Sequence, residues 1–334
     1  MPILIHKAPS PSEDPILVAA DKLAPEVRQA FLNAIAAVRA SIDEKALADA
    51  IGKGDIRKVM GLLDIQNKLT GAMAGKGLAA GVKSVRDALQ DAFVAGAEAA
   101  MFQLPSKISV EMSFNLMNPK TVEFLNNYSF NLIRQVSQDT RDAVKQVVTR
   151  AFQEGGHPFQ QAREIKQFIG LTTTQEQAVT NYRNALTSGG ASDLKDALSR
   201  ALRDGRYDKT LLRAISNQTA IPANRVDAMV QRYRERFLQY RARNVARTES
   251  ARASVKGQRA LWKQAVDQDL LPDDVRRVWI ISGDSDTCPE CEELEGETAG
   301  LDEEFAPGVM EPPDPHPSCR CTVAISPESL KKAA

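Results

Sequence analysis

All four cysteines of the chain, and one of its three histidines, lie close together near the C-terminal end. Cys288 and Cys291 form a C-x2-C pair in DTCPECEEL, and His316, Cys319 and Cys321 follow in HPSCRC. Thiolates and imidazole are ligands that zinc prefers, and two paired clusters joined by a loop are a common source of four of them. The spacing predicts a tetrahedral zinc-type site held by the four cysteines. His316 is the substitute if the C-x-C pair cannot both reach the ion.

A zinc ion with four protein ligands is structural, because a catalytic zinc keeps one position open for water or substrate. We therefore expect zinc as a structural cofactor and no enzymatic activity. Two other interpretations of the cysteines stay open: free buried thiols, and disulfides formed after the protein leaves a reducing compartment. A metal-dependent hydrolase, such as a nuclease or a toxin-like enzyme, also stays open because acidic residues surround the cluster. These residues are Asp284, Asp286, Glu290 and Glu293.

Other catalytic motifs fit the chain poorly. Zinc deaminases need a P-C-x-x-C motif downstream of the first ligand, whereas the C-x-E at Cys291 is followed by S-C-R-C. GKGLAAG at residues 75–81 matches G-x-G-x-x-A, but no strand precedes it, so we interpret it as a bend between helices. The chain contains neither G-x-x-x-x-G-K-[ST] nor G-x-S-x-G.

Composition narrows the class of protein further. The 334 residues carry 43 Lys and Arg against 43 Asp and Glu, and 43% are hydrophobic, which is typical of a globular chain. A formal charge of zero argues against a general nucleic-acid binder. Only three histidines are present, which excludes multi-histidine metal enzymes. No apolar run is long enough to span a membrane, and MPILIHKAPSPSEDP lacks the features of a signal peptide, so we expect a protein of the cytosol.

Apolar spacings of three and four, with frequent alanine, predict a mainly helical chain up to residue 221. Pro119 and Pro158 are favourable first residues for the helices that follow them. Residues 105–118 show a short apolar alternation that predicts a strand or hairpin arm. The predicted helices are 25–41, 43–51, 55–69, 76–104, 119–154, 158–170, 175–186, 192–203 and 222–270.

The C-terminal segment follows a different pattern. β-Branched and aromatic residues predict strands at 276–282 and 321–326, and the stretch between them has no helical periodicity. These features indicate a small α+β module that a metal stabilises in place of a large core. The predicted organisation is a flexible Pro-rich arm (1–15), a helical domain (16–221), a long basic helix (222–270) and a Cys/His metal-binding module (271–334).

The long basic helix carries a narrow apolar seam. Val226, Val230, Tyr233, Phe237 and Tyr240 alternate in steps of four and three, as in a coiled coil. Packing of this seam on the protein's own helical domain is the preferred interpretation. Contact with another subunit is the alternative.

Several motifs in the last quarter of the chain occur in a recognisable order. They are ARTE at residues 246–249, Trp279, the run DTC ending at Cys288, Cys291, Leu294, Gly296, Phe305 and PPDPHPSCRC from Pro312. Together they resemble the Mu F-like minor head protein family of tailed phages, a head morphogenesis family. The resemblance implies that metal binding falls on Cys288, Cys291, Cys319, Cys321 and His316, without fixing which four bind.

The resemblance also implies a function. It points to a minor capsid protein of the phage head interior that associates with the portal and is needed for head assembly. The expected locations are the virion and, during assembly, the host cytoplasm. The expected partners are the portal protein, the capsid interior, further copies of the chain, and packaged DNA through the basic helix. No defined reaction comes with the family. A zinc-finger protein that binds nucleic acid is a further alternative, although the acidic module would be repelled by phosphate.

The zero net charge conceals a strongly basic segment and a strongly acidic segment. Residues 225–263 carry eleven Lys and Arg against three Asp and Glu, whereas residues 284–314 carry twelve acids and no Lys or Arg. We predict that the basic helix and the acidic loop attract each other; two separately solvated faces are the alternative. Glu249 and Arg252, three apart on the helix, are expected to form a surface ion pair. A role in packing the long helix against the metal-binding module is the main alternative.

Overall fold

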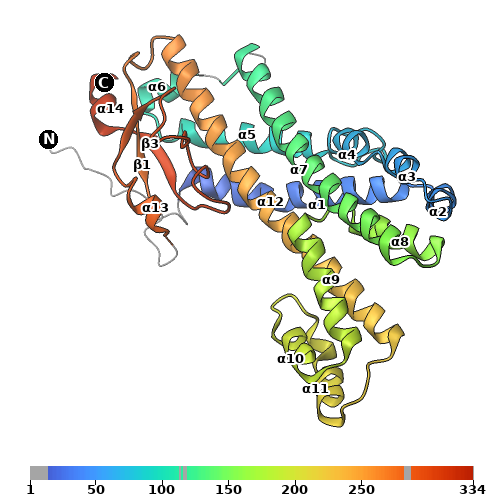
Figure 1. Cartoon of the computed structure of the whole chain (residues 1–334). Coiled ribbons are helices and arrows are strands. Elements are labelled where there is room, and N and C mark those ends of the chain that lie inside the picture. The colour runs from blue at the N-terminus through green and yellow to red at the C-terminus, as the bar shows by residue number, and fades with distance from the viewer. Residues whose placement is uncertain (1–13, 113, 116–118, 282–286, 334) are drawn as a thin grey trace. The chain divides into compact units, whose positions relative to one another are not determined.

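A computed structural model describes residues 14–112, 114–115, 119–281 and 287–333. The protein is mainly helical, with one small antiparallel sheet near its C-terminus (Figure 1). The contacts between its residues divide the chain into two compact units. Unit 1 takes Met1–Phe31, Gly81–Phe130 and Arg243–Ala334, and unit 2 takes Leu32–Ala80 and Asn131–Ala242. Each unit is therefore assembled from stretches that are far apart in the sequence.

The helices have the following bounds in chain order. They are α1 (Pro15–Ala40), α2 (Glu44–Gly52), α3 (Ile56–Leu63), α4 (Ile65–Met73), α5 (Val85–Met101), α6 (Ser106–Glu111), α7 (Pro119–Glu154), α8 (Pro158–Phe168), α9 (Thr173–Ser188), α10 (Ala191–Ser199), the short 3-10 helix η1 (Gly205–Tyr207), α11 (Asp208–Asn217), α12 (Ala223–Asp267), α13 (Pro289–Glu292) and α14 (Pro327–Ala333). No described helix is both long and apolar enough to cross a membrane.

Two long helices agree closely with the sequence prediction. α7 has the predicted bounds, with Pro119 as its first residue, and α12 begins and ends within three residues of the predicted 222–270. The predicted helix 55–69 is interrupted at Asp64, whose φ of 39° places it in the left-handed region. The chain therefore forms two short helices, α3 and α4, at this position.

The first helix is longer than predicted. α1 begins at Pro15 and not at Pro25, which lies inside it. Asp14 provides the start, because its Oδ1 accepts hydrogen bonds from the backbone N–H groups of Ile16 at 2.8 Å and Leu17 at 3.2 Å. The remainder of the predicted flexible arm, residues 1–13, lies outside the described residues.

Two other predictions are wrong. The predicted helix 76–104 begins only at Val85, where the Ser84 hydroxyl accepts from the Asp87 N–H, because Gly75, Gly77 and Gly81 all have positive φ. This confirms the interpretation of GKGLAAG as a connection between helices. The predicted strand or hairpin arm at 105–118 is instead helical over α6; residues 113 and 116–118 lie outside the described residues. A short apolar alternation did not distinguish a strand from one and a half helical turns.

Unit 2 packs the apolar seam of α12 on its own helices. Val226, Val230 and Tyr233 are buried, and the Tyr233 ring lies 4.3 Å from the ring of Tyr182 on α9. Tyr240, at the end of the seam, is 43% exposed. The preferred interpretation of the seam is confirmed for the residues up to Tyr233.

Unit 1 brings α5 and α12 into unusually close contact. A Cβ atom at Gly96 of α5 would lie 2.1 Å from the backbone oxygen of Ser254, and one at Gly257 of α12 would lie 1.9 Å from that of Phe93. The Ser254 hydroxyl donates to the Ala92 carbonyl at 2.9 Å across the same contact. Only glycine fits at these two positions. The close crossing of α5 and α12 therefore fixes the position of α12 in the core that it shares with the sheet.

The sheet has three antiparallel strands in the order β2-β1-β3, with β1 at Arg276–Ile280, β2 at Thr298–Gly300 and β3 at Thr322–Ile325. β1 pairs Val278 with Thr298 of β2 and with Ala324 of β3. Both predicted strands are therefore confirmed. The predicted scarcity of core is wrong, because the strands share one hydrophobic cluster with α5 and α12 that includes Trp262, Trp279 and three of the cysteines.

Candidate metal centre

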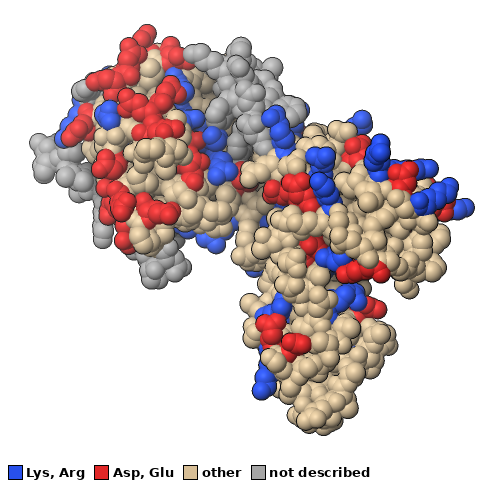
Figure 2. All heavy atoms as spheres, in the orientation of Figure 1, with Lys and Arg blue, Asp and Glu red and all other residues tan. Residues whose placement is uncertain are grey.

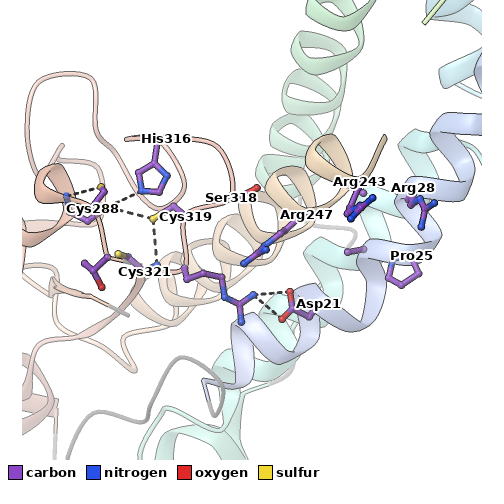
Figure 3. A pocket seen from close by; sticks show the side chains of 15 residues that line it. Asp21, Pro25, Arg28, Arg243, Arg247, Cys288, His316, Ser318, Cys319 and Cys321 are labelled. Atoms are coloured by element: carbon purple, nitrogen blue, oxygen red, sulfur yellow. Dashed lines mark hydrogen bonds and ion pairs between the residues drawn. The ribbon is translucent and has the colours of Figure 1, made fainter. Parts of the chain in front are cut away.

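The cysteines and the histidine reach one place from two segments. Cys288 caps the N-terminus of α13, and Pro289 at the first helical position lets the short C-P-E-C turn form. Cys291 lies on that helix and is buried. His316, Cys319 and Cys321 come from the segment that leads into β3. Figure 3 shows His316, Cys288 and Cys319 grouped at one end of a pocket.

The ligand atoms form two overlapping groups that share Cys291. In the first are Cys288, Cys291 and His316, and in the second are Cys291, Cys319 and Cys321; within each group the ligand atoms lie within 4.8 Å of one another. The Cys291 Sγ lies 3.7 Å from the Cys319 Sγ and 3.4 Å from the His316 Nε2. The structure thus brings together all five predicted ligands, with Cys291 at the centre.

These distances fit zinc. Tetrahedral bonds of about 2.3 Å to sulfur and 2.0 Å to nitrogen place two sulfurs about 3.8 Å apart and a sulfur and a nitrogen about 3.5 Å apart. The observed spacings around Cys291 are close to both values. They exclude a disulfide between Cys291 and Cys319, and all four cysteines are free.

Hydrogen bonds orient the ligands. The Nδ1 of His316 donates to its neighbour's carbonyl, Pro317 O, at 3.1 Å, and Nε2 is directed to the cluster, 3.4 Å from the Cys291 Sγ. The backbone N–H of Cys291 donates to the Cys288 Sγ, and that of Cys321 donates to the Cys319 Sγ, both at 3.4 Å. Such donors favour the thiolate forms that bind metals.

Burial opposes charge on the same sulfurs. It raises the pKa of Cys291 to about 12, with Cys288 and Cys321 adding to the effect. The neighbouring Cys321 and burial together raise the pKa of Cys319 well above its usual range. At neutral pH these two thiols hold their protons, and a cation at the centre of the cluster would provide the charge that displaces them.

The ARTE motif holds the ligand segment from the side of α12. The Thr248 hydroxyl accepts a hydrogen bond of 3.0 Å from the N–H of Ser318, which lies between His316 and Cys319. Ser318 has a φ of 63°, so this bond supports a backbone conformation that serine rarely adopts. Thr248 thereby positions two of the candidate ligands.

The expected ion pair of ARTE forms, but it is not a surface pair. Glu249 and Arg252 are 2.8 Å apart, and only 8% of the Glu249 side chain is exposed. Arg252 also lies 3.6 Å from Asp314. Asp314 in turn accepts the backbone N–H groups of Met310 and Glu311. The pair therefore joins α12 to the segment that precedes His316.

Arg277, the second residue of β1, is fully buried. Its guanidinium donates to the carbonyl oxygens of Gly300, Met310 and Glu303, and lies 4.8 Å from the ring centre of Phe305. Burial lowers its pKa to about 10, so it stays charged at neutral pH. The Arg277 side chain thus holds in place the irregular loop that connects β2 to the segment with His316, Cys319 and Cys321.

Glu311 provides a buried ionic contact between the loop and α12. Its carboxylate is fully buried and lies 2.9 Å from Lys256 and 3.3 Å from Arg259. Lys263 on the same helix pairs with Asp302. These contacts confirm the predicted attraction between the basic helix and the acidic loop.

The other described acids of the loop face solvent. Figure 2 shows acidic side chains gathered over the part of unit 1 that carries β1 and α13 in Figure 1. Glu290 and Glu293, predicted as possible catalytic groups, are exposed on this surface. Asp284 and Asp286 lie outside the described residues. The acidic stretch therefore combines a few inward anchors with a solvated face.

We expect Glu311→Gln to destabilise unit 1 by about 3 kcal/mol, because it leaves the partly buried charges of Lys256 and Arg259 without their carboxylate. Urea unfolding followed by tryptophan fluorescence measures this directly, since both tryptophans, Trp262 and Trp279, are buried in unit 1. Glu295→Gln, which removes the same charge from the exposed face, is expected to change stability by less than about 0.5 kcal/mol. Equal losses in the two variants would contradict the anchoring role of Glu311.

Comparison with known families agrees with this geometry. Residues 192–324 match the family model described as Phage Mu protein F like protein. This part of the chain is similar to the phage Mu F-like family. The Mu F-like region begins in α10, ends in β3 and includes all five candidate ligands, so the resemblance drawn from ARTE and the cysteines is confirmed. Comparisons with curated proteins and with solved structures gave no match.

Proposed function

We propose that the protein is a minor capsid protein of a phage head, associated with the portal and required for head morphogenesis. The observation that carries this proposal is the Mu F-like match over residues 192–324, within which the chain assembles a complete Cys/His cluster. Its location is the virion, and the host cytoplasm during assembly.

Zinc is the cofactor that we propose for the cluster. Cys288, Cys291, Cys319, Cys321 and His316 supply the soft and borderline ligands that zinc prefers, and the distances from Cys291 to Cys319 and His316 suit tetrahedral coordination. The ion would link α13 to the segment leading into β3, and would balance the charge of buried thiolates. We assign it a structural role and no reaction, since Glu290 and Glu293 face solvent and not the cluster.

The proposed partners are the portal protein, the inner face of the capsid, further copies of the chain and packaged DNA. Support for the DNA contact comes from residues 225–263, in which Arg225, Arg232, Arg236, Arg243 and Arg247 are exposed along α12. Exposed arginines on one helix suit the phosphate backbone without reading base sequence.

Mature particles and procapsids of the phage test the assembly role. We expect the protein to be present in small copy number in particles, and to co-purify with tagged portal protein. Absence of the protein from both particles and procapsids would contradict the proposal. Phage that lacks the protein should give heads of reduced infectivity, and normal particle yield with full infectivity would count equally against it.

A further inference from the structure

One pocket of unit 1 lies directly beside the cysteine cluster. It has a volume of about 630 Å³, and its lining joins three separate parts of the chain: α1, α12 and the ligand segments. Figure 3 shows His316, Cys288 and Cys319 grouped in one part of the pocket, and Arg247, Arg243 and Arg28 extending from there along the two helices. The lining therefore places a row of guanidinium groups next to the metal centre.

The charge of the lining is strongly unbalanced. Among the residues that the structure describes, it contains four arginines, Arg28, Arg243, Arg247 and Arg320, but a single carboxylate, Asp21. Arg320 already holds that carboxylate, with its Nη1 at 2.8 Å from both oxygens. A zinc ion with three thiolates and one histidine carries a net charge of −1, and one with four thiolates −2, so the lining stays positive when the metal is bound.

The arrangement of the arginines suits one class of anion. Arg243 and Arg247 are four residues apart on α12, hence on the same face, and both are exposed to solvent. Arg28 approaches from α1. A carboxylate is satisfied by a single guanidinium, as Asp21 is by Arg320. A phosphate group has three terminal oxygens and up to two charges, and it accepts from several guanidinium groups at once.

The pocket is larger than a bare phosphate needs. Volumes of about 300–1,000 Å³ are typical of sites for small organic ligands. Ala24, Pro25 and Ala246 add an apolar wall beside the arginines, on which the rest of such a ligand could pack. We propose that this pocket binds the phosphate of a phosphate ester of nucleotide size, with Arg243, Arg247 and Arg28 as the recognising groups. This site goes beyond the head-assembly role and does not depend on it.

Binding of dAMP to the zinc-loaded full-length chain, measured by calorimetry, tests the proposal. We expect saturable binding of dAMP, competition by inorganic phosphate, and no binding of deoxyadenosine, which lacks the phosphate. Arg243→Gln and Arg247→Gln should each weaken dAMP binding about tenfold, as for the loss of one charge-assisted hydrogen bond. Arg213→Gln removes an exposed charge from α11, outside the pocket, and should leave the affinity unchanged.

Two short oligonucleotides, one with a 5′-phosphate and one with a 5′-hydroxyl, then identify the source of the phosphate. Tighter binding of the phosphorylated strand than of dAMP assigns the pocket to a nucleic-acid end, and weaker binding assigns it to a free nucleotide. The proposal is overturned if deoxyadenosine binds as well as dAMP, if no dAMP binding is found, or if Arg213→Gln weakens binding as much as Arg247→Gln. Thermal melts of each variant show that the exposed substitutions leave the fold intact, whichever result is obtained.

Discussion

Replacing Cys291 with serine is expected to abolish zinc binding. Cys291 is the one residue common to both groups of ligand atoms, and four of the five possible sets of four ligands contain it. We expect the wild-type protein to hold one equivalent of zinc by elemental analysis, and Cys291→Ser to hold none. Retention of zinc by Cys291→Ser would remove the basis for this centre.

Loss of the ion should also destabilise unit 1. A zinc-finger peptide that has no other core gains about 10–16 kcal/mol from its metal. Here the cysteines share a hydrophobic cluster with Trp262 and Trp279, so we expect a smaller loss, on the order of 5 kcal/mol. Urea unfolding followed by tryptophan fluorescence reports it.

Chelation provides the matched control for this experiment. A chelator should lower the stability of the wild-type protein to that of Cys291→Ser, added zinc should restore it, and neither treatment should affect the variant. Cys321→Ser and His316→Ala then separate the alternatives for the fourth ligand. The substitution that leaves one equivalent of zinc bound identifies the residue outside the coordination sphere.

Gly257→Ala should be among the most destabilising substitutions that add a single methyl group. The new Cβ would lie 1.9 Å from the Phe93 backbone oxygen, and backbone at a helix crossing cannot rotate away as a side chain can. The two helices would have to separate, which breaks the hydrogen bond from Ser254 to Ala92. We expect a loss of about 3 kcal/mol or more, at the upper end of overpacking effects, and a similar loss for Gly96→Ala.

Gly61→Ala is the matched control. Gly61 lies in helix α3, and no atom is found within 4 Å of the position that its Cβ would occupy. Alanine is favoured over glycine in a helix by about 0.8–1.0 kcal/mol, so this variant should be slightly more stable than wild type. Circular dichroism during urea unfolding compares all three variants. An unchanged midpoint for Gly257→Ala would contradict the close crossing.

The helices that were predicted well are those with local signals. Pro119 and Pro158 each begin a helix in the structure, because proline is compatible with the first turn and needs no hydrogen-bond partner there. The errors occurred where a single side chain or φ angle decides. Asp64 in the left-handed region divides α3 from α4, and Asp14 starts α1 ten residues early. Asp64 has no local pattern that distinguishes it from a surface residue, whereas Asp14 followed by Pro15 is a helix-start signal hidden among the prolines and serines of the first fifteen residues.

The candidate ligands could be predicted from the sequence, but the residues that hold the ligand segments in position could not. Cysteine is rare and its spacing is constrained by the metal, so composition alone directs attention to it. Thr248, Arg277 and Glu311 are of common residue types, and each acts on a segment far away in the chain: Thr248 on Ser318, for example, seventy positions later. Charge patterning did predict that α12 and the acidic loop attract each other. It did not show which acid would be buried.

The division of unit 1 among three stretches has a consequence for folding. Contacts that complete the unit join residues very far apart, such as Asp21 and Arg320, which are separated by 299 positions. Residues 14–31 and 81–112 therefore leave the ribosome long before α12 and the sheet exist to cover them. Contacts of such large sequence separation are slow to form, and apolar surfaces stay exposed until they do. The cysteine cluster and the adjoining pocket are then completed only when synthesis has passed Cys321.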